Sequence, residues 1–321
     1  MRLDRFCVYK GEIEMNQKLN GIFSVISTPF TDMLDVDYES LENCVQFALD
    51  SNASGVLTTA MSAEFYTLTD EEHYRIVETI AKKLAGRISI VAGIVSDSWQ
   101  QCVAYAKHAE ANGAAAINLT PPYLESTKWG FSWDDTLRFF DEINRSVHIP
   151  MFIQNSKLLG CNMNVSQVLE LAQRFENVQY VKEEGFDCRQ NITSILEAAK
   201  KLPEGTFSGV MTGSGHNLIE DFRRGVSGIM ITPEFTDYYV DIWNAFHSGD
   251  EAKAIAMHGK LTPMIIYEDI YWESLAKYIQ KRRGIIKTDA IRATISMFTD
   301  SNRQEVERML RTFEPLLRVR Y

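Results

Sequence analysis

Residues 178–185 read VQYVKEEG, an apolar strand-like run that ends in a lysine and two glutamates. An ammonium group at the end of a buried strand needs a reason, because burial disfavours the charged form of lysine. The neutral amine that burial favours can attack a ketone and form a Schiff base. Taken alone, the run favours a Lys182 that is simply paired with Glu183 or Glu184. Its position among the neighbouring segments favours the chemical interpretation.

The run is the sixth of eight strand-like segments, each followed by a segment with helix-like periodicity. The eight segments are residues 21–28, 54–59, 88–94, 114–120, 150–155, 178–183, 206–210 and 228–232. Strands that alternate with helices are parallel, and eight such units predict an α/β fold, a closed (β/α)₈ TIM barrel. No GxGxxG motif follows the first segment, which removes the main support for a dinucleotide-binding fold.

Three regions are expected along the chain. Residues 1–17 show no clear periodicity and are expected to form an N-terminal extension. The barrel is predicted to span residues 18–250. Residues 251–321 read as helices only, and no glycine-rich linker precedes them. We therefore expect a C-terminal helical extension that packs on the barrel.

Composition excludes several classes of function. The formal charge of −10 and the absence of any Lys/Arg-rich run argue against a nucleic-acid partner. No apolar run is long enough to span a membrane, and the N-terminus lacks the apolar stretch of a signal peptide. The five scattered cysteines and six histidines show no metal-ligand spacing. A cytoplasmic protein without a metal, a cofactor or a membrane partner is expected.

In barrels of this kind, catalytic groups lie at the C-terminal ends of the strands. Lys182 is the one lysine at these ends in the sequence. Side chains alternate along a strand, so Lys182 and Glu184 share a face, and Glu183 is expected to point toward the helices. The 212–215 segment, TGSG, either binds an anion or forms the turn before a helix, with Ser214 as its cap.

Residues 180–183, YVKE, resemble the Schiff-base lysine strand of the dihydrodipicolinate synthase and N-acetylneuraminate lyase superfamily. Three other segments carry the same resemblance. Residues 26–30, ISTPF, look like its first-strand TPF signature, and residues 64–72, EFYTLTDEE, are similar to the segment after its second strand. Residues 119–123, LTPPY, resemble its fourth-strand motif. The likeness extends over nearly all of residues 20–300.

The resemblance implies a class I lyase in which Lys182 forms an imine with a small 2-oxo acid. It also implies a homo-oligomer, either a dimer or a tetramer. Two departures bear on the reaction. Gln154 stands where the family's aldolases have a proton-relaying tyrosine, and an amide cannot take that proton. Residues 60–64, AMSAE, replace the GTTGE motif, so that Ser62 and the backbone amides of Met61 and Ser62 remain to hold the substrate carboxylate.

Together, Gln154 and the Lys182-x-Glu184 pair look like the dehydratase branch, typified by 2-keto-3-deoxy-L-arabonate dehydratase. A protonated imine at C2 acidifies the C3–H bond, a nearby carboxylate removes that proton, and the C4 hydroxyl group leaves. Glu184 is expected to be this base, with a simple counter-ion role as the alternative. The predicted catalytic residues are Lys182, Glu184 and Gln154, and the predicted substrate-binding residues are Met61, Ser62, Tyr123, Gly209 and Thr232.

Two other functions stay open. The first is a pyruvate-releasing aldolase of the same superfamily, in which Gln154 orders a water molecule that does the work of the tyrosine. The second is a barrel without catalytic activity that senses a 2-oxo acid, as the loss of glycine and threonine around Met61 allows. Glu64 is expected to hold the loop after the second strand by hydrogen bonds rather than to contact substrate.

Overall fold

The computed structural model describes residues 18–122, 132–156, 162–184, 188–293 and 298–321. The N-terminal extension expected at residues 1–17 lies outside these ranges. Within them, no helix combines the length and apolar character that crossing a bilayer requires.

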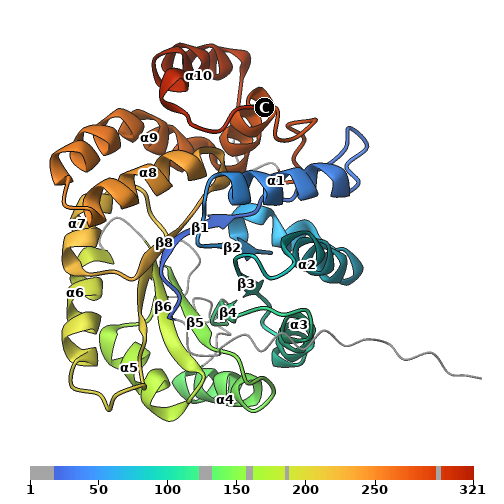
Figure 1. Ribbon diagram of the computed structural model, residues 1–321. Coiled ribbons are helices and arrows are strands. Elements are labelled where there is room, and N and C mark those ends of the chain that lie inside the picture. The colour runs from blue at the N-terminus through green and yellow to red at the C-terminus, as the bar shows by residue number, and fades with distance from the viewer. Residues whose placement is uncertain (1–17, 123–131, 157–161, 185–187, 294–297) are drawn as a thin grey trace, which may run out of the picture.

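The described strands form a closed barrel in which each strand pairs in parallel with its neighbours along the chain, and β8 pairs with β1 (Figure 1). The strands are β1 (Gly21–Val25), β2 (Gly55–Thr58), β3 (Ser89–Ile94), β4 (Ala116–Leu119), β5 (Met151–Ser156), β6 (Val178–Glu184), β7 (Gly209–Thr212) and β8 (Gly228–Ile231). The predicted (β/α)₈ barrel is confirmed.

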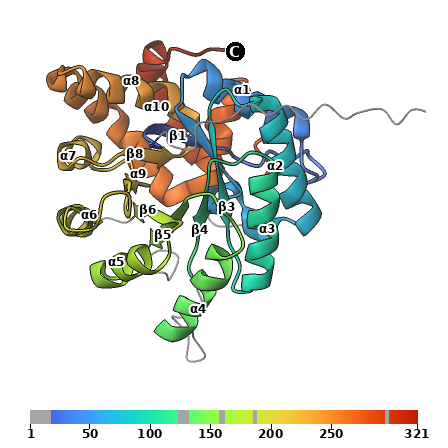
Figure 2. The ribbon, with the colours of Figure 1, turned by 60° about the horizontal axis from the view of Figure 1, so that its bottom comes forward.

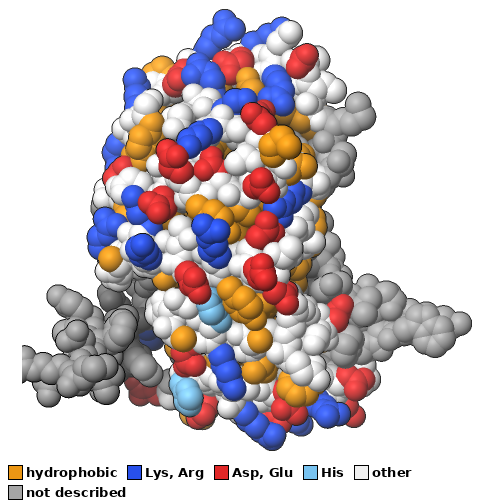
Figure 3. All heavy atoms as spheres, turned by 90° about the vertical axis from the view of Figure 1, so that its right-hand side faces the viewer, with side chains coloured by type: hydrophobic (Ala, Val, Ile, Leu, Met, Phe, Trp, Pro, Cys, Tyr) orange, Lys and Arg blue, Asp and Glu red, His pale blue; other side chains and the backbone are white. Residues whose placement is uncertain are grey.

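Helices surround the barrel, and two more follow its last unit (Figures 1 and 2). They are α1 (Tyr38–Asp50), α2 (Asp70–Leu84), α3 (Trp99–Ala111), α4 (Trp133–Asn144), α5 (Val165–Arg174), α6 (Cys188–Ala199), α7 (Leu218–Arg224), α8 (Thr236–His247), α9 (Glu251–Arg282) and α10 (Asp300–Phe313). Each outer helix buries an apolar face and leaves charges outside. On the face that carries α2 and α3, acidic and basic side chains are interspersed (Figure 3).

The alternation of side chains along β6 divides the core into two layers. Val181 packs in the layer between the strands and the helices, whereas Tyr180 lies in the separate cluster that fills the barrel interior. There Tyr180 stacks on Phe152 of β5, with ring centroids 4.4 Å apart. Its hydroxyl accepts a hydrogen bond from the backbone N–H of Leu19 at 3.1 Å. This packed interior forms the floor below the C-terminal ends of the strands.

The C-terminal extension is built around α9, which packs against α8 beside β1 and β8 (Figures 1 and 2). The helix is interrupted at Trp272, whose φ of 43° and ψ of −126° are not helical. Its second half reaches the barrel mouth, where the Gln280 amide donates to the Ser27 hydroxyl at 2.9 Å. The predicted helical extension is confirmed, while its boundary at residue 251 as a domain limit stays a prediction.

A buried ion pair joins α9 to the loop after β2. Lys277 and Glu64 are 1% and 0% exposed, and the Lys277 ammonium bonds the Glu64 carboxylate. The other oxygen of Glu64 accepts from the backbone N–H groups of Arg292 and Ala293, at 2.8 and 3.0 Å. Glu64 thus holds its loop by hydrogen bonds, as expected, and binds the segment after α9 to it.

We expect Lys277→Met to lower the free energy of unfolding by about 3–5 kcal/mol, because it leaves the buried Glu64 carboxylate without its cation. Urea denaturation followed by circular dichroism measures the change. Lys281→Met is the matched control on the same helix, since Lys281 is 48% exposed and its ion pair should contribute only about 0–1 kcal/mol. Equal losses in the two variants would contradict a dominant role for the buried pair.

Candidate active site

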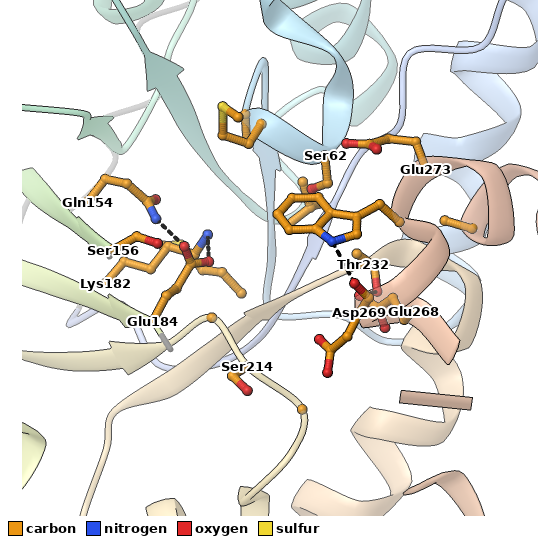
Figure 4. Close-up of a pocket in the computed structure, with 18 of the residues that line it drawn as sticks. Ser62, Gln154, Ser156, Lys182, Glu184, Ser214, Thr232, Glu268, Asp269 and Glu273 are labelled. Atoms are coloured by element: carbon orange, nitrogen blue, oxygen red, sulfur yellow. Dashed lines mark hydrogen bonds and ion pairs between the residues drawn. The ribbon is translucent and has the colours of Figure 1, made fainter. Parts of the chain in front are cut away.

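A cavity opens at the C-terminal ends of the strands, and both strand residues and α9 line it (Figure 4). The strands and the loops after them contribute residues that include Met61, Ser62, Asn118, Thr120, Gln154, Ser156, Lys182, Glu184, Gly213, Ser214, His216 and Thr232. Helix α9 contributes Ile265, Glu268, Asp269, Trp272, Glu273 and Ala276. The position is the one at which barrel enzymes carry their catalytic groups.

A chain of polar contacts crosses three adjacent strands in the cavity. The Lys182 ammonium lies 2.6 Å from one carboxylate oxygen of Glu184, and the Gln154 amide nitrogen donates to the other at 2.5 Å (Figure 4). Asn118 of β4 donates to the Gln154 carbonyl at 2.7 Å. Asn118, Gln154 and Lys182 are 2%, 4% and 6% exposed, so these groups interact in a site that is largely shielded from water.

Asn118 settles which way Gln154 faces. The Asn118 side-chain N–H group donates a hydrogen bond to the carbonyl oxygen of Gln154. The amide N–H group of Gln154 therefore faces Glu184. The amide therefore orients the carboxylate and has no acceptor directed at the site. Sequence reasoning missed Asn118, although an asparagine within the apolar strand Ala116–Leu119 is a signal that could have found it.

Glu183 lies on the opposite face of β6 and points toward the helical layer, as predicted. It is 2% exposed, and its two oxygens accept from Asn155 at 2.8 Å and from Asn191 of α6 at 2.9 Å. This glutamate therefore holds α6 against the barrel. The structure separates two adjacent glutamates that look alike in the sequence, one facing the cavity and one facing the helices.

The end of β7 differs from its prediction. The strand was expected at residues 206–210, but it spans Gly209–Thr212, because Thr206 N–H bonds Pro203 C=O in a turn at 3.1 Å. Gly209 consequently pairs with Tyr180, at the level of the barrel interior. Gly209 is not among the residues that line the cavity, whereas Gly213 is, so the structure gives its predicted contact with substrate no support.

Gly213 makes room for the catalytic candidate beside it. A Cβ atom built on Gly213 would lie 2.1 Å from Glu184 Oε1 and 2.4 Å from Glu184 Cγ. Only glycine avoids this overlap. The backbone after β7 thus approaches the carboxylate closely and confines it beside Lys182.

Of the other predicted binding residues, three line the cavity. Met61 and Ser62, in the short 3₁₀ helix η1 (Met61–Ala63), line the cavity together with Thr232. The Thr232 hydroxyl contacts two carboxylates, Glu268 at 2.7 Å and Glu234 at 3.2 Å. Tyr123 lies outside the described residues.

Helix α9 gives the cavity an acidic side that sequence reasoning missed. Glu268, Asp269 and Glu273 line it, and Glu234 lies just behind Thr232. Burial raises the pKa of Glu234 to about 7, and burial together with the neighbouring Glu234 raises the pKa of Glu268 well above its ordinary value. Near neutral pH, Glu268 is therefore held largely in the protonated form and Glu234 in part.

A Ser–His–Asp chain lies at the edge of the cavity. The His216 ring bonds the Ser214 hydroxyl through Nδ1 and the Asp269 carboxylate through Nε2. Ser214 also accepts from the backbone N–H of His216 at 3.3 Å, in a turn before α7, but the N-cap of α7 is Asn217 and not the expected Ser214. Across the described ranges, no cluster of three or more histidine, cysteine or acidic side chains is arranged to hold a metal ion.

Comparison with known proteins gives concordant matches. The model of the dihydrodipicolinate synthetase family matches residues 18–313. An L-2-keto-3-deoxyarabonate dehydratase from Azospirillum brasilense is 25% identical over 298 residues, 92% of this chain and 95% of the dehydratase. A 4-hydroxy-tetrahydrodipicolinate synthase from Chlorobium luteolum is 31% identical over 215 residues, 67% of this chain and 69% of the synthase.

Solved structures show the same fold. Dihydrodipicolinate synthase from Aquifex aeolicus superimposes with a TM-score of 0.82 at 23% identity, and the match covers 94% of this chain and 99% of that one. Fold and relatives together define a (β/α)₈-barrel lyase. The chain belongs to the dihydrodipicolinate synthetase family, whose model spans most of its length. The superfamily inferred from the motifs is confirmed, as is the likeness to the arabonate dehydratase.

We expect Gly213→Ala to lower lyase activity by about 10²-fold or more, because the new methyl group displaces the Glu184 carboxylate from Lys182. Steady-state kinetics measure the loss, and thermal denaturation checks that the fold persists. Gly259→Ala is the control, since no atom lies within 4 Å of a Cβ built at this position on α9. Full activity of Gly213→Ala would show that the carboxylate tolerates displacement.

Proposed function

We propose that the chain is a hydro-lyase that dehydrates a 2-keto-3-deoxy sugar acid through an imine on Lys182. One observation carries the proposal. The Glu184 carboxylate contacts the Lys182 ammonium through one oxygen, while the Gln154 amide holds the other. An amine and a carboxylate in contact at the barrel mouth are the two groups that imine-assisted elimination requires.

The first step joins substrate and enzyme. Glu184 takes a proton from the Lys182 ammonium across their 2.6 Å contact, and the neutral amine attacks the C2 ketone. The C2 oxygen leaves as water, and a protonated imine remains. Gln154 keeps the carboxylate beside the reacting carbons, because its own orientation is set by Asn118.

The second step eliminates water. Glu184 removes the C3 proton, and the electron pair of the C–H bond moves into the imine to form an enamine. The enamine returns this pair and expels the C4 hydroxyl group, which leaves with a proton as a second molecule of water. Hydrolysis of the conjugated imine consumes one water, frees Lys182 and gives, after tautomerisation, a dioxo acid with every carbon of the substrate.

Elimination is favoured over carbon–carbon cleavage by the groups that face the cavity. Cleavage needs a base at the C4 hydroxyl proton, whereas elimination needs that oxygen to leave. Gln154 is an amide whose N–H donors face the site, and no tyrosine occurs among the described residues that line the cavity. Similarity to the Azospirillum brasilense dehydratase over 92% of this chain also supports the proposal.

We further propose that the protein is a homo-oligomer, which sedimentation would test.

The product distinguishes elimination from cleavage. With a 2-keto-3-deoxypentonate, we expect a dioxo acid of unchanged carbon count, because only the C3 proton and the C4 hydroxyl group are lost, together as water. Mass spectrometry identifies the product, and a coupled lactate dehydrogenase assay detects pyruvate. Stoichiometric pyruvate would show an aldolase instead and would overturn the dehydratase assignment.

Chemical trapping at Lys182 and a variant of Glu184 test the mechanism. Borohydride with pyruvate should reduce an imine on Lys182, and the adduct mass should appear on the peptide that contains it. Glu184→Gln should keep this trapping and lose turnover by about 10²–10⁴-fold, the range for general acid–base groups. Glu176→Gln, an exposed glutamate before β6, is the control.

Three results would contradict these expectations. An adduct on another lysine would refute the role of Lys182, and near wild-type turnover of Glu184→Gln would return Glu184 to a counter-ion role. If no adduct formed at all, the barrel would be a sensor of 2-oxo acids rather than an enzyme. Glu183→Gln is unsuitable as a control, because Glu183 holds Asn155 and Asn191.

A further inference from the structure

Glu273 is a buried carboxyl group that lines the cavity without a bonding partner. The residue is 3% exposed, and neither carboxyl oxygen has a hydrogen-bond partner among the described residues. Its side chain extends from α9 toward Ser62 (Figure 4). A buried carboxyl group left unpartnered costs stability, so its presence indicates an interaction made with a ligand.

The groups around Glu273 disfavour its charged form. The ammonium group of Lys277, one turn along α9, bonds the Glu64 carboxylate and donates to the Ala290 carbonyl at 3.1 Å. From the segment after β2, Glu64 and the partly exposed Tyr66 face the same region, and neither is a cation. Burial raises the pKa of Glu273 to about 7 and the nearby Glu64 adds to the rise, while the residue's own backbone N–H and Lys277 offset part of it. Glu273 is therefore a hydrogen-bond donor below neutral pH.

A 2-oxo acid brings a carboxylate that needs donors. We infer that, with C2 bonded to Lys182, the C1 carboxylate occupies the end of the same cavity that Met61 and Ser62 line. The basic side chains among the described lining residues are Lys182 and His216, which bond Glu184 and Asp269. The Ser62 end therefore depends on neutral donors.

We propose that Glu273 binds the C1 carboxylate of the substrate as a neutral carboxylic acid, donating one hydrogen bond beside the Ser62 hydroxyl. The bond is of the O–H···O⁻ type, which is short and strong. A carboxylic acid kept neutral by an apolar site is an established donor in enzymes. The inference rests on the proposed imine at Lys182 and adds a binding residue that α9 supplies.

The sign of the pH dependence follows from the protonation state. Below pH 7 the neutral group donates, and above it the carboxylate repels the substrate carboxylate. The affinity for a 2-oxo acid should fall about fivefold from pH 7 to pH 8 and about tenfold for each further pH unit, because only the protonated fraction binds. Glu273→Gln keeps an N–H donor and cannot ionise, so its affinity should not show this fall.

The test measures borohydride trapping at Lys182 against ligand concentration at pH 6, 7 and 8. Pyruvate carries the carboxylate, and methyl pyruvate is the matched ligand without it. For wild type, we expect the half-saturating pyruvate concentration to rise about fivefold from pH 7 to pH 8 relative to that of methyl pyruvate, as the protonated fraction of Glu273 falls. In Glu273→Gln this ratio should stay constant, and in Glu273→Leu pyruvate should bind weakly throughout.

Glu251→Gln, at the start of α9 and outside the cavity, is the control and should behave as wild type. If Glu273→Gln and wild type show the same pH dependence of the pyruvate to methyl pyruvate ratio, the inference is overturned while the imine stands. If neither ligand gives an adduct on wild-type Lys182, the proposed function fails, and the inference fails with it. The two failures are therefore distinguishable.

Discussion

The alternation of side chains along β6 is the constraint on which the site depends. Tyr180, Lys182 and Glu184 share the inward face, so the residue that anchors the packed interior also sets the direction of the two reactive groups above it. The stack of Tyr180 on Phe152 fixes β6 against β5, and Gln154 of β5 is thereby held at the level of Lys182. A slip of one residue would exchange Glu184 for Glu183 and place the carboxylate among the helices.

The barrel mouth is completed by α9, a helix that follows the eighth unit of the barrel. The buried pair of Lys277 and Glu64 fastens this helix to the loop after β2, and carboxyl groups on the same helix then face the cavity. Burial keeps protons on Glu268 and Glu273. Glu268 and Glu273 can therefore stand beside the site proposed for an anionic substrate, because burial favours their neutral, hydrogen-bond-donating forms.

Much of the fold was predictable because it rests on local pattern. Eight apolar runs alternating with amphipathic helices require a parallel barrel, and the period of two places Lys182 and Glu184 together. The position of Gln154 at the end of the fifth run was visible in the same way, whereas its comparison with an aldolase tyrosine came from the family resemblance. The seventh strand was misplaced because Thr206 favours a strand by its residue type, yet its N–H is bound in a turn.

By itself, the sequence determined the barrel and the direction of the lysine and the two glutamates on β6, since each depends on the periodicity or identity of neighbouring residues. Only the tertiary structure decided that Asn118 orients Gln154, that Gly213 confines Glu184, and that Glu273 reaches the cavity from α9. These contacts join residues far apart along the chain, and their geometry follows from barrel closure and helix docking, which no local pattern records.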